Sequence, residues 1–331
     1  MTPGPAPDRL EGMNNVTHDL AVTTRALTKT FGRGAQARTV VDSVDLAVPR
    51  GTVYGFLGPN GSGKSTTMKM LLGLLTPTSG DFELLGGPVT RATRASIMAR
   101  TGSMIEQPPG YGHLTGAENM RIVGKMLHLT AQQTDRALDL VRLTEHKDKL
   151  VRAYSLGMKQ RLGIAMALAR QPELLILDEP TNGLDPAGIE EIRTLLIDLA
   201  SQGVTVMVSS HLLDEIDKMA QVLGILSAGR LVFQGTRAQL MAKSLPDLRV
   251  VTPRPGDITP SLLAGLVPGD GEVLPVFGDE AAVRIPGLTA DAAAELVRRM
   301  VGAGIPVHEA RREAQSLEDV FMDLTGGAGA L

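Results

Sequence analysis

The stretch that decides the fold reads Gly58-Pro59-Asn60-Gly61-Ser62-Gly63-Lys64-Ser65. It follows the apolar run 53–57 and precedes the helical pattern of residues 66–75, so it joins a strand to a helix. Its glycines let successive backbone N–H groups point into one concavity, which the N-terminus of the following helix makes electropositive. The stretch therefore predicts a phosphate-binding loop rather than a glycine-rich turn that binds nothing.

The residues of this loop have distinct expected roles toward a nucleoside triphosphate. Lys64 would place its ammonium group against the β- and γ-phosphates, and the hydroxyl of Ser65 would ligate the Mg²⁺ that bridges them. The expected nucleotide-binding residues are Gly58, Pro59, Asn60, Gly61, Ser62, Gly63, Lys64, Ser65 and Thr66.

Composition bounds the class of protein. With 331 residues, two domains are the first expectation. The net charge of −3, from 33 basic and 36 acidic residues, argues against an electropositive face, so no nucleic-acid partner is expected. The absence of cysteine excludes disulfides and thiolate catalysis and favours the cytoplasm. No apolar run approaches the roughly 18 residues of a spanning helix, so a soluble chain is expected.

The order of the segments predicts an α/β fold. Residues 1–19, rich in Pro and Gly, are expected to form a disordered tail. Apolar segments between 20 and 48 predict an antiparallel β patch, and strands alternating with helices up to 245 predict a parallel core sheet. Helical patterns at 117–127 and 131–141, within about 107–170, predict a helical insertion. Frequent prolines after Leu245 mark a boundary, and residues 246–331 are expected to form a small α+β accessory domain.

Two carboxylates follow the buried strand predicted at 174–177. Ligands of open α/β sheets lie at the carboxyl ends of the strands, where Asp178 and Glu179 are placed. Asp178 would hold Mg²⁺ from the side opposite Ser65, and Glu179 would act as general base toward the attacking water. Two acids at a strand end also suit an ordinary polar turn, but the phosphate-binding loop upstream favours the catalytic interpretation.

His211 and Phe31 each carry two interpretations. His211 follows another predicted strand, whose carboxyl end should lie beside that of the Asp178 strand, so it could reach the γ-phosphate. A lone histidine is more often a helix N-terminal residue without chemistry. Phe31 is either a core residue or a surface on which a base stacks, and the residues alone favour the core.

Together these residues resemble the nucleotide-binding subunit of an ATP-binding cassette (ABC) transporter over about residues 20–245. The decisive piece is similar to the family's signature loop at the start of a helix, and it reads Tyr154-Ser155-Leu156-Gly157-Met158-Lys159-Gln160-Arg161. The resemblance implies that two subunits sandwich two ATP molecules head to tail. It also implies that Ser155 and the N–H of Gly157 donate to the γ-phosphate across the interface.

The resemblance assigns further residues and contains two departures. It implies that 182–185 form the D-loop, that His211 is the switch histidine and that adenine stacks on Phe31. Leu156 stands where a second glycine is usual. Glu106 stands where the Q-loop glutamine is usual, with Gln107 one residue later, so the Mg²⁺ contact falls to Glu106 or Gln107.

These departures resemble the branch of bacterial exporters acting on bacitracin-like and lantibiotic peptides, and residues 316–325 are similar to the tail of drug-exporter ATPases. The resemblance implies an ATPase at the cytoplasmic face of the membrane that drives export through a separate membrane permease subunit. An importer ATPase shares the same chemistry and is the alternative. A soluble translation or repair ATPase is disfavoured, because those proteins carry two cassettes or a long coiled coil.

Overall fold

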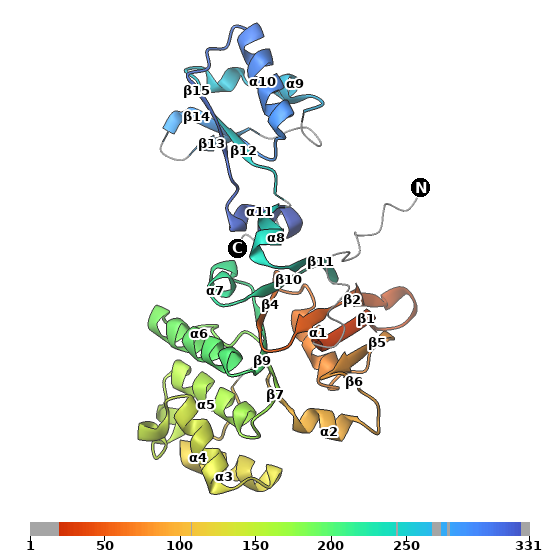
Figure 1. Ribbon diagram of the computed structural model, residues 1–331, viewed down its shortest axis with the longest axis vertical. Helices are drawn as coiled ribbons and strands as arrows, with labels where there is room; N and C mark the ends of the chain where they lie inside the picture. The colour runs from red at the N-terminus through yellow and green to blue at the C-terminus, as the bar shows by residue number, and fades with distance from the viewer. Residues whose placement is uncertain (1–19, 107, 243, 267–272, 277–278, 326–331) are drawn as a thin grey trace. The chain divides into compact units, whose positions relative to one another are not determined.

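The computed structural model describes residues 20–106, 108–242, 244–266, 273–276 and 279–325 (Figure 1). Contacts divide the chain into two compact units. The described part of the first unit runs from Leu20 to Thr236 and includes Leu324 and Thr325, and the second unit runs from Arg237 to Asp323. The contacts thus place a boundary earlier in the chain than the change of composition after Leu245. The tail predicted at 1–19 lies outside the described residues.

The largest sheet of the described chain has six strands in the order β11-β10-β4-β9-β8-β7. The five strands from β10 to β7 pair in parallel, and β11 is antiparallel to β10. The strands are β4 (Val53–Leu57), β7 (Thr101–Met104), β8 (Leu174–Leu177), β9 (Thr205–Ser210), β10 (Val222–Ser227) and β11 (Arg230–Gly235). Because β4 lies inside this sheet, the loop that follows it opens at the carboxyl edge of its parallel strands.

Strand β4 is buried on both faces, as a continuous apolar run in a parallel sheet requires. Tyr54 and Phe56 belong to a core that this face of the sheet shares with α1 (Lys64–Leu71) and the antiparallel strands. Gly55 faces α7 (Leu213–Asp217), because a Cβ there would lie 2.1 Å from a methyl group of Ile216. Helix α6 (Pro186–Ser201) contacts β4 and β9. The sheet therefore has covering elements on each face.

The antiparallel β patch is a second sheet, in the order β2-β1-β5-β6 with β3 also paired to β1. Its strands are β1 (Leu20–Phe31), β2 (Arg38–Val44), β3 (Ala47–Pro49), β5 (Ser79–Leu84) and β6 (Gly87–Pro88). A short 3₁₀ turn at Gly34–Gln36 joins β1 to β2, and α2 (Arg94–Ala99) leads from this sheet to β7. The long strand β1 ends at Phe31, so that residue lies at the end of the patch.

The helical insertion lies between β7 and β8 in the chain. It contains α3 (Gly116–Leu127), α4 (Ala131–Leu140) and α5 (Leu156–Leu168), which contact one another, and 3₁₀ turns at Thr144–His146 and Val151–Ala153. Helices α3 and α4 each begin with a capping box, in which Thr115 pairs with Glu118 and Thr130 with Gln133. These caps fix the helix starts where the sequence pattern placed them.

The second unit has its own core around an antiparallel sheet in the order β13-β14-β12-β15. Side chains from α9 (Pro260–Leu263) and α10 (Ala290–Gly302) join that core. The other elements are α8 (Arg237–Ala242), β12 (Asp247–Val251), a 3₁₀ turn at Pro255–Asp257, β13 (Leu274–Val276), β14 (Asp279–Ile285), β15 (Glu309–Glu313) and α11 (Leu317–Thr325), whose last two residues belong to the first unit.

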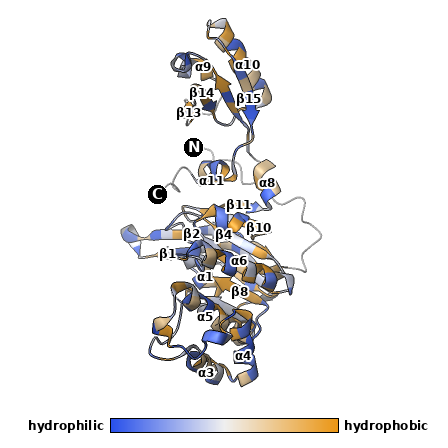
Figure 2. Cartoon of the chain, turned by 90° about the vertical axis from the view of Figure 1, so that its left-hand side faces the viewer, coloured by the Kyte–Doolittle hydropathy of each residue, from blue (hydrophilic) through white to orange (hydrophobic). Residues whose placement is uncertain are grey.

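The α/β fold class expected from the sequence is confirmed. Strands β11 and β15 were not expected, because neither shows a clear apolar alternation. Figure 2 shows β8 in the hydrophobic colour and β15 in the hydrophilic one, as Leu-Leu-Ile-Leu and Glu-Ala-Arg-Arg-Glu dictate. None of the helices that the structure describes is long and apolar enough to cross a membrane.

Candidate nucleotide-binding site

The loop from Gly58 to Gly63 connects β4 to α1 in the strand–loop–helix arrangement that a phosphate cradle requires. Gly63 is the N-cap of α1 and has φ 107°, in the left-handed region that favours glycine. A Cβ at this position would also lie 2.7 Å from the carbonyl oxygen of Val40. A side chain at Gly63 would therefore both strain the loop and collide with the antiparallel sheet.

Lys64 is the charged group at the centre of the site. Its side chain is only 6% exposed, and Nζ donates to the carbonyl oxygen of Gly58 at 2.6 Å. Nζ also lies 3.5 Å from Oε1 of Glu179. Burial lowers the pKa of the Lys64 ammonium, and the neighbouring Glu179 carboxylate partly opposes that shift. A phosphate group would supply the additional negative charge that a buried ammonium favours.

Asp178 and Glu179 emerge from β8 beside the end of β9. Asp178 is 3% exposed, and its Oδ1 accepts a hydrogen bond from Ser209 Oγ at 2.6 Å. The same Ser209 oxygen accepts from the backbone N–H of Glu179 at 2.9 Å. Ser209 therefore fixes both carboxylate residues, although the sequence pattern gave it no role. The parallel pairing of β8 with β9 could have suggested it, since Leu177 pairs with Val208.

The carboxylate of Glu179 lies between two basic groups. Oε2 is 2.8 Å from Nδ1 of His211, while Oε1 faces Nζ of Lys64. Glu179 has φ 49°, an uncommon conformation for a residue with a side chain, and the hydrogen bond from its N–H to Ser209 helps to hold it there. The structure thus brings together Lys64, Glu179 and His211, as the meeting of parallel strand ends predicts.

The loop has polar groups to offer a triphosphate. Among the described residues, Ser62 has a hydroxyl oxygen that is buried and lacks a hydrogen-bond partner, and Ser65 and Thr66 are half-buried at the start of α1. A buried hydroxyl without a partner is costly, and a phosphate oxygen would satisfy it. In the described chain, no cluster of three His, Asp or Glu side chains could hold a metal alone.

The signature residues Ser155 and Gly157 line a groove that is separate from the phosphate-binding loop. Ser155 is the exposed N-cap of α5, and its Oγ accepts from the N–H of Met158 at 3.2 Å, which leaves its own proton free to be donated. Gly157 is the second residue of α5, where N–H groups have no partner within the helix. Both residues line a groove of about 380 Å³ with 183–185 and α6, and none of the phosphate-loop residues lines it.

Phe31 and Glu106 are the remaining predicted site residues that the structure describes. The Phe31 ring is 42% exposed with Nζ of Lys29 5.2 Å from its centre, so the core interpretation is wrong. Glu106 has φ 69° and forms an ion pair with Lys69 of α1, and its side chain is 66% exposed. Gln107 lies outside the described residues.

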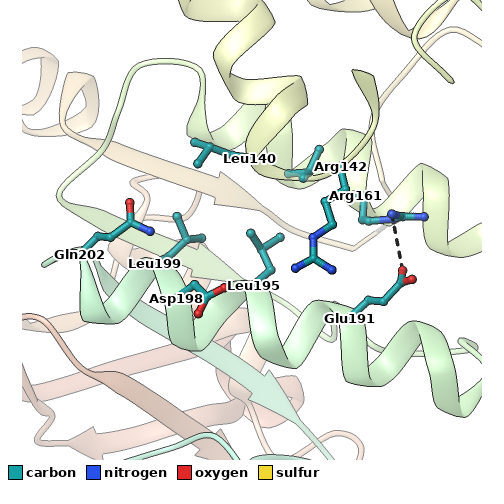
Figure 3. A pocket seen from close by; sticks show the side chains of 9 residues that line it. Leu140, Arg142, Arg161, Glu191, Leu195, Asp198, Leu199 and Gln202 are labelled. Carbon is teal, nitrogen blue, oxygen red and sulfur yellow. Dashed lines mark ion pairs between the residues drawn. The ribbon is translucent and has the colours of Figure 1, made fainter. Parts of the chain in front are cut away.

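A smaller cleft of about 90 Å³ lies between the end of α4, α5 and α6. Figure 3 shows Arg142 and Arg161 pointing toward α6 there. The dashed line marks the ion pair of 3.5 Å between Arg161 and Glu191. The cleft contains none of the predicted nucleotide ligands, but Arg161 belongs to the signature stretch.

Comparison with known proteins identifies the family. The model of the family described as "ABC transporter" matches residues 41–182. The uncharacterized ABC transporter ATP-binding protein YcbN of Bacillus subtilis is 38% identical, over 92% of this chain and 97% of that protein. The chain belongs to the ABC transporter ATP-binding proteins.

Two further relatives of this ABC ATPase add detail. The bacitracin transport ATP-binding protein BcrA of Enterococcus faecalis is 37% identical, over 94% of this chain and 98% of that protein. The solved dimeric post-hydrolysis state of the ATP-binding cassette MJ0796, bound to ADP and Pi, has a TM-score of 0.58 and 25% identity, over 65% of this chain and 98% of that chain. The ABC resemblance inferred from the signature residues is confirmed, and so are ATP as the ligand and ATP hydrolysis as the reaction.

Proposed function

We propose that this ABC ATPase hydrolyses Mg²⁺–ATP in a head-to-tail dimer and thereby drives export of a bacitracin-like peptide antibiotic through a separate membrane permease. The observation that carries the proposal is the Glu179 carboxylate, held between Nζ of Lys64 at 3.5 Å and Nδ1 of His211 at 2.8 Å. A carboxylate in this place, beside a phosphate-binding loop, is positioned to accept a proton from a water that attacks the γ-phosphate.

The loop residues bind and orient the nucleotide in this proposal. The N–H groups at the start of α1 and Lys64 contact the β- and γ-phosphates, and Phe31 offers an exposed ring for adenine. Ser65 and Asp178 hold Mg²⁺, with Glu106 or Gln107 as a further ligand. The ion, when bound, neutralises charge that develops on the phosphate oxygens.

Glu179 and His211 have different roles at the γ-phosphate. Glu179 accepts the proton of the attacking water, and Ser209 keeps its backbone in the conformation that points the carboxylate at the loop. His211 orients this carboxylate through Nδ1 and contacts the γ-phosphate from the end of β9. Glu179 follows β8 and His211 follows β9, so neighbouring strands of one sheet place the two side chains together.

Dimer formation completes the site. Ser155 is exposed and Gly157 half-exposed, and both are at the start of α5, where N–H groups favour an anion. These donors reach the γ-phosphate held by the loop of the second copy. The dimeric cassette found among the solved structures supports this arrangement.

The similarity to BcrA supports the proposed cargo. BcrA is a bacitracin transport protein, and this chain matches it along nearly its full length. The ATPase acts at the cytoplasmic face of the membrane, where a permease subunit contacts the helical insertion. The cargo contacts the permease rather than this chain.

The test is the Glu179→Gln chain, because this change removes the base and leaves the cradle intact. ATP should then bind and stay, and light scattering should give a dimer with ATP and a monomer with ADP or no nucleotide. Ser155→Ala in this background should weaken the dimer about tenfold, the loss of one donor to a charged group. Thr130→Ala is the matched control, since it removes the N-cap of α4 away from the signature.

The proposal fails if Glu179→Gln hydrolyses ATP at the wild-type rate. It also fails if this variant binds ATP but stays monomeric, alone and in the presence of the membrane subunit.

A further inference from the structure

The signature loop and the D-loop of one chain interlock through two leucines. Leu156 Cδ2 lies 3.0 Å from the point where a Cβ on Gly183 would stand. In the opposite direction, Leu184 Cδ2 lies 3.8 Å from the corresponding point on Gly157. Each leucine therefore packs on a glycine of the other loop, and both glycines leave room for it.

The backbone conformation at Gly183 keeps this space open for Leu156. Gly183 has φ 75°, where a side chain is strained, so the position favours glycine and offers a bare backbone surface. Leu156 is 43% exposed, so it does not belong to the core of the helical insertion. Leu156 contacts the D-loop of its own chain at the groove that Ser155 and Gly157 also line.

The two loops are continued by helices that are themselves tied together. Ser155 caps α5, and Asp185 caps α6 by accepting from the N–H of Gly188 at 3.2 Å. Further along, Arg161 of α5 pairs with Glu191 of α6 (Figure 3). The helices that continue the two loops are thus capped at their starts and joined by an ion pair further along.

We propose that Leu156 is a positioning residue that couples the D-loop to the signature donors Ser155 and Gly157. This inference rests on the proposed function, in which those donors act on the nucleotide of the second copy. The leucine at this position holds the start of α5 against Gly183, so the donors and the D-loop move as one body. Truncating the leucine leaves a gap between the loops, and each loop then samples its positions independently.

The first test is a double-mutant cycle on the steady-state turnover of the full chain. Leu156→Ala removes the contact, and Gly183→Ala adds a Cβ that approaches Leu156 Cδ2 tightly, at 3.0 Å, and strains the backbone. Since the tight approach is relieved in the double variant, its turnover should exceed the product of the two single effects at least threefold. Leu74→Ala combined with Gly183→Ala is the control, because Leu74 is an exposed leucine after α1, and these two effects should simply multiply.

The second test separates positioning from a loss of folding or of ATP binding. Leu156→Ala should lower kcat about fivefold while the affinity for a fluorescent ATP analogue stays within twofold, because the phosphate-binding loop is untouched. Leu156→Met has nearly the same volume and should restore kcat to within twofold of wild type. Multiplicative effects in the cycle, or a Leu156→Met chain as slow as Leu156→Ala, would overturn the inference.

The failure of this inference differs from the failure of the proposed function. If the two single effects on turnover simply multiply while the Glu179→Gln variant dimerises with ATP, only the proposed role of Leu156 is excluded. A Glu179→Gln chain that binds ATP without dimerising removes the proposed function, and the role of Leu156 with it.

Discussion

Lys64 shows how one residue combines stability and binding. Its ammonium is buried and donates to Gly58, so it already has partners within the loop. We expect Lys64→Ala to lower turnover about 100-fold or more, because the main positive charge facing the β- and γ-phosphates is lost. Steady-state ATPase and nucleotide titrations on the purified chain measure the effect. Wild-type turnover in this variant would remove the assignment of the phosphate-binding loop.

Glu106 and Gln107 compete for one role toward Mg²⁺. If the Glu106 carboxylate helps to hold the ion, the ion shares this carboxylate with Lys69, its partner in the structure. Glu106→Gln should then shift the Mg²⁺ concentration for half-maximal turnover about threefold or more. If Gln107 holds the ion, Gln107→Ala should be the more damaging change.

Magnesium titrations of both variants separate these cases, and Lys69→Ala is the control for loss of the ion pair alone. If neither the Glu106 nor the Gln107 variant changes the Mg²⁺ dependence of turnover, neither side chain reaches the ion.

The sequence predicts the positions of some site residues but not of others. The proximity of Asp178, Glu179 and His211 follows from strands whose carboxyl ends share an edge, so spacing and apolar runs suffice. Ser209 lies at the same edge, but its role was not predicted, because that role comes from a hydrogen bond between two strands distant in the chain. The exposure of Phe31 and the pairing of Glu106 depend on tertiary neighbours and have no local signal.

At the scale of elements, the loop from Pro108 to Thr115 presents an aromatic side chain on a fixed backbone. Buried Asn119 of α3 accepts from the N–H of Tyr111 at 2.8 Å and donates to its carbonyl oxygen at 3.1 Å. The Tyr111 ring is 57% exposed. The loop backbone is therefore held without the ring, which is exposed and contacts only the edge of its neighbour His113 among the ring pairs described, at 5.8 Å between ring centres.

We expect Tyr111→Ala to keep the ATPase of the isolated chain within about twofold of wild type and to reduce co-purification with the membrane subunit several-fold. The reason is that the ring is lost while the hydrogen bonds of Asn119 to the backbone remain. Met126→Ala, an exposed change on α3, serves as the control. Complex formation at the wild-type level would count against docking at this loop.

The capping boxes of α3 and α4 make a matched pair for a pH experiment. Hydrogen bonds from the backbone and side chain of Thr115 hold the pKa of Glu118 below its usual range, whereas Gln133 in the other box does not titrate. A carboxyl with a lowered pKa in the folded state stabilises above its unfolded pKa and loses that stabilisation as the pH falls through the folded pKa.

We therefore expect the decrease in Tm caused by Glu118→Ala to stay constant down to the ordinary pKa of a Glu carboxyl, about 4.3, and to shrink as the pH falls further. The decrease caused by Gln133→Ala should stay constant over the same range. Circular dichroism melts of the three proteins measure both, and a parallel response of the two variants would contradict the assignment.

Elements with strong local signals were predicted well, and those without them were not. Helices α3 and α4 carry apolar periodicity and a capping residue, and β8 is a continuous apolar run, so each was expected within a few residues of its bounds. Strand β15 consists of four charged residues and one alanine. Its pairing with β12 comes from backbone hydrogen bonds, which leave no apolar pattern in the sequence.

At the scale of the whole molecule, the proposed export role makes a prediction in cells. A strain of the source organism without this chain should become several-fold more sensitive to bacitracin, because the permease has no energy source. Wild-type chain supplied in trans should restore resistance, and Lys64→Ala should not. An antibiotic of unrelated structure is the control. Unchanged sensitivity to bacitracin would contradict the proposed cargo while leaving the ATPase assignment intact.

The order of strands in the six-stranded sheet has a consequence for synthesis on the ribosome. Strand β4 carries the phosphate-binding loop, yet its two neighbours, β9 and β10, end at Ser210 and Ser227. Both edges of β4 stay open until those residues have left the exit tunnel, and open strand edges invite association with other chains. A nascent chain stalled before Thr205 would hold every residue of the phosphate-binding loop and still bind no nucleotide.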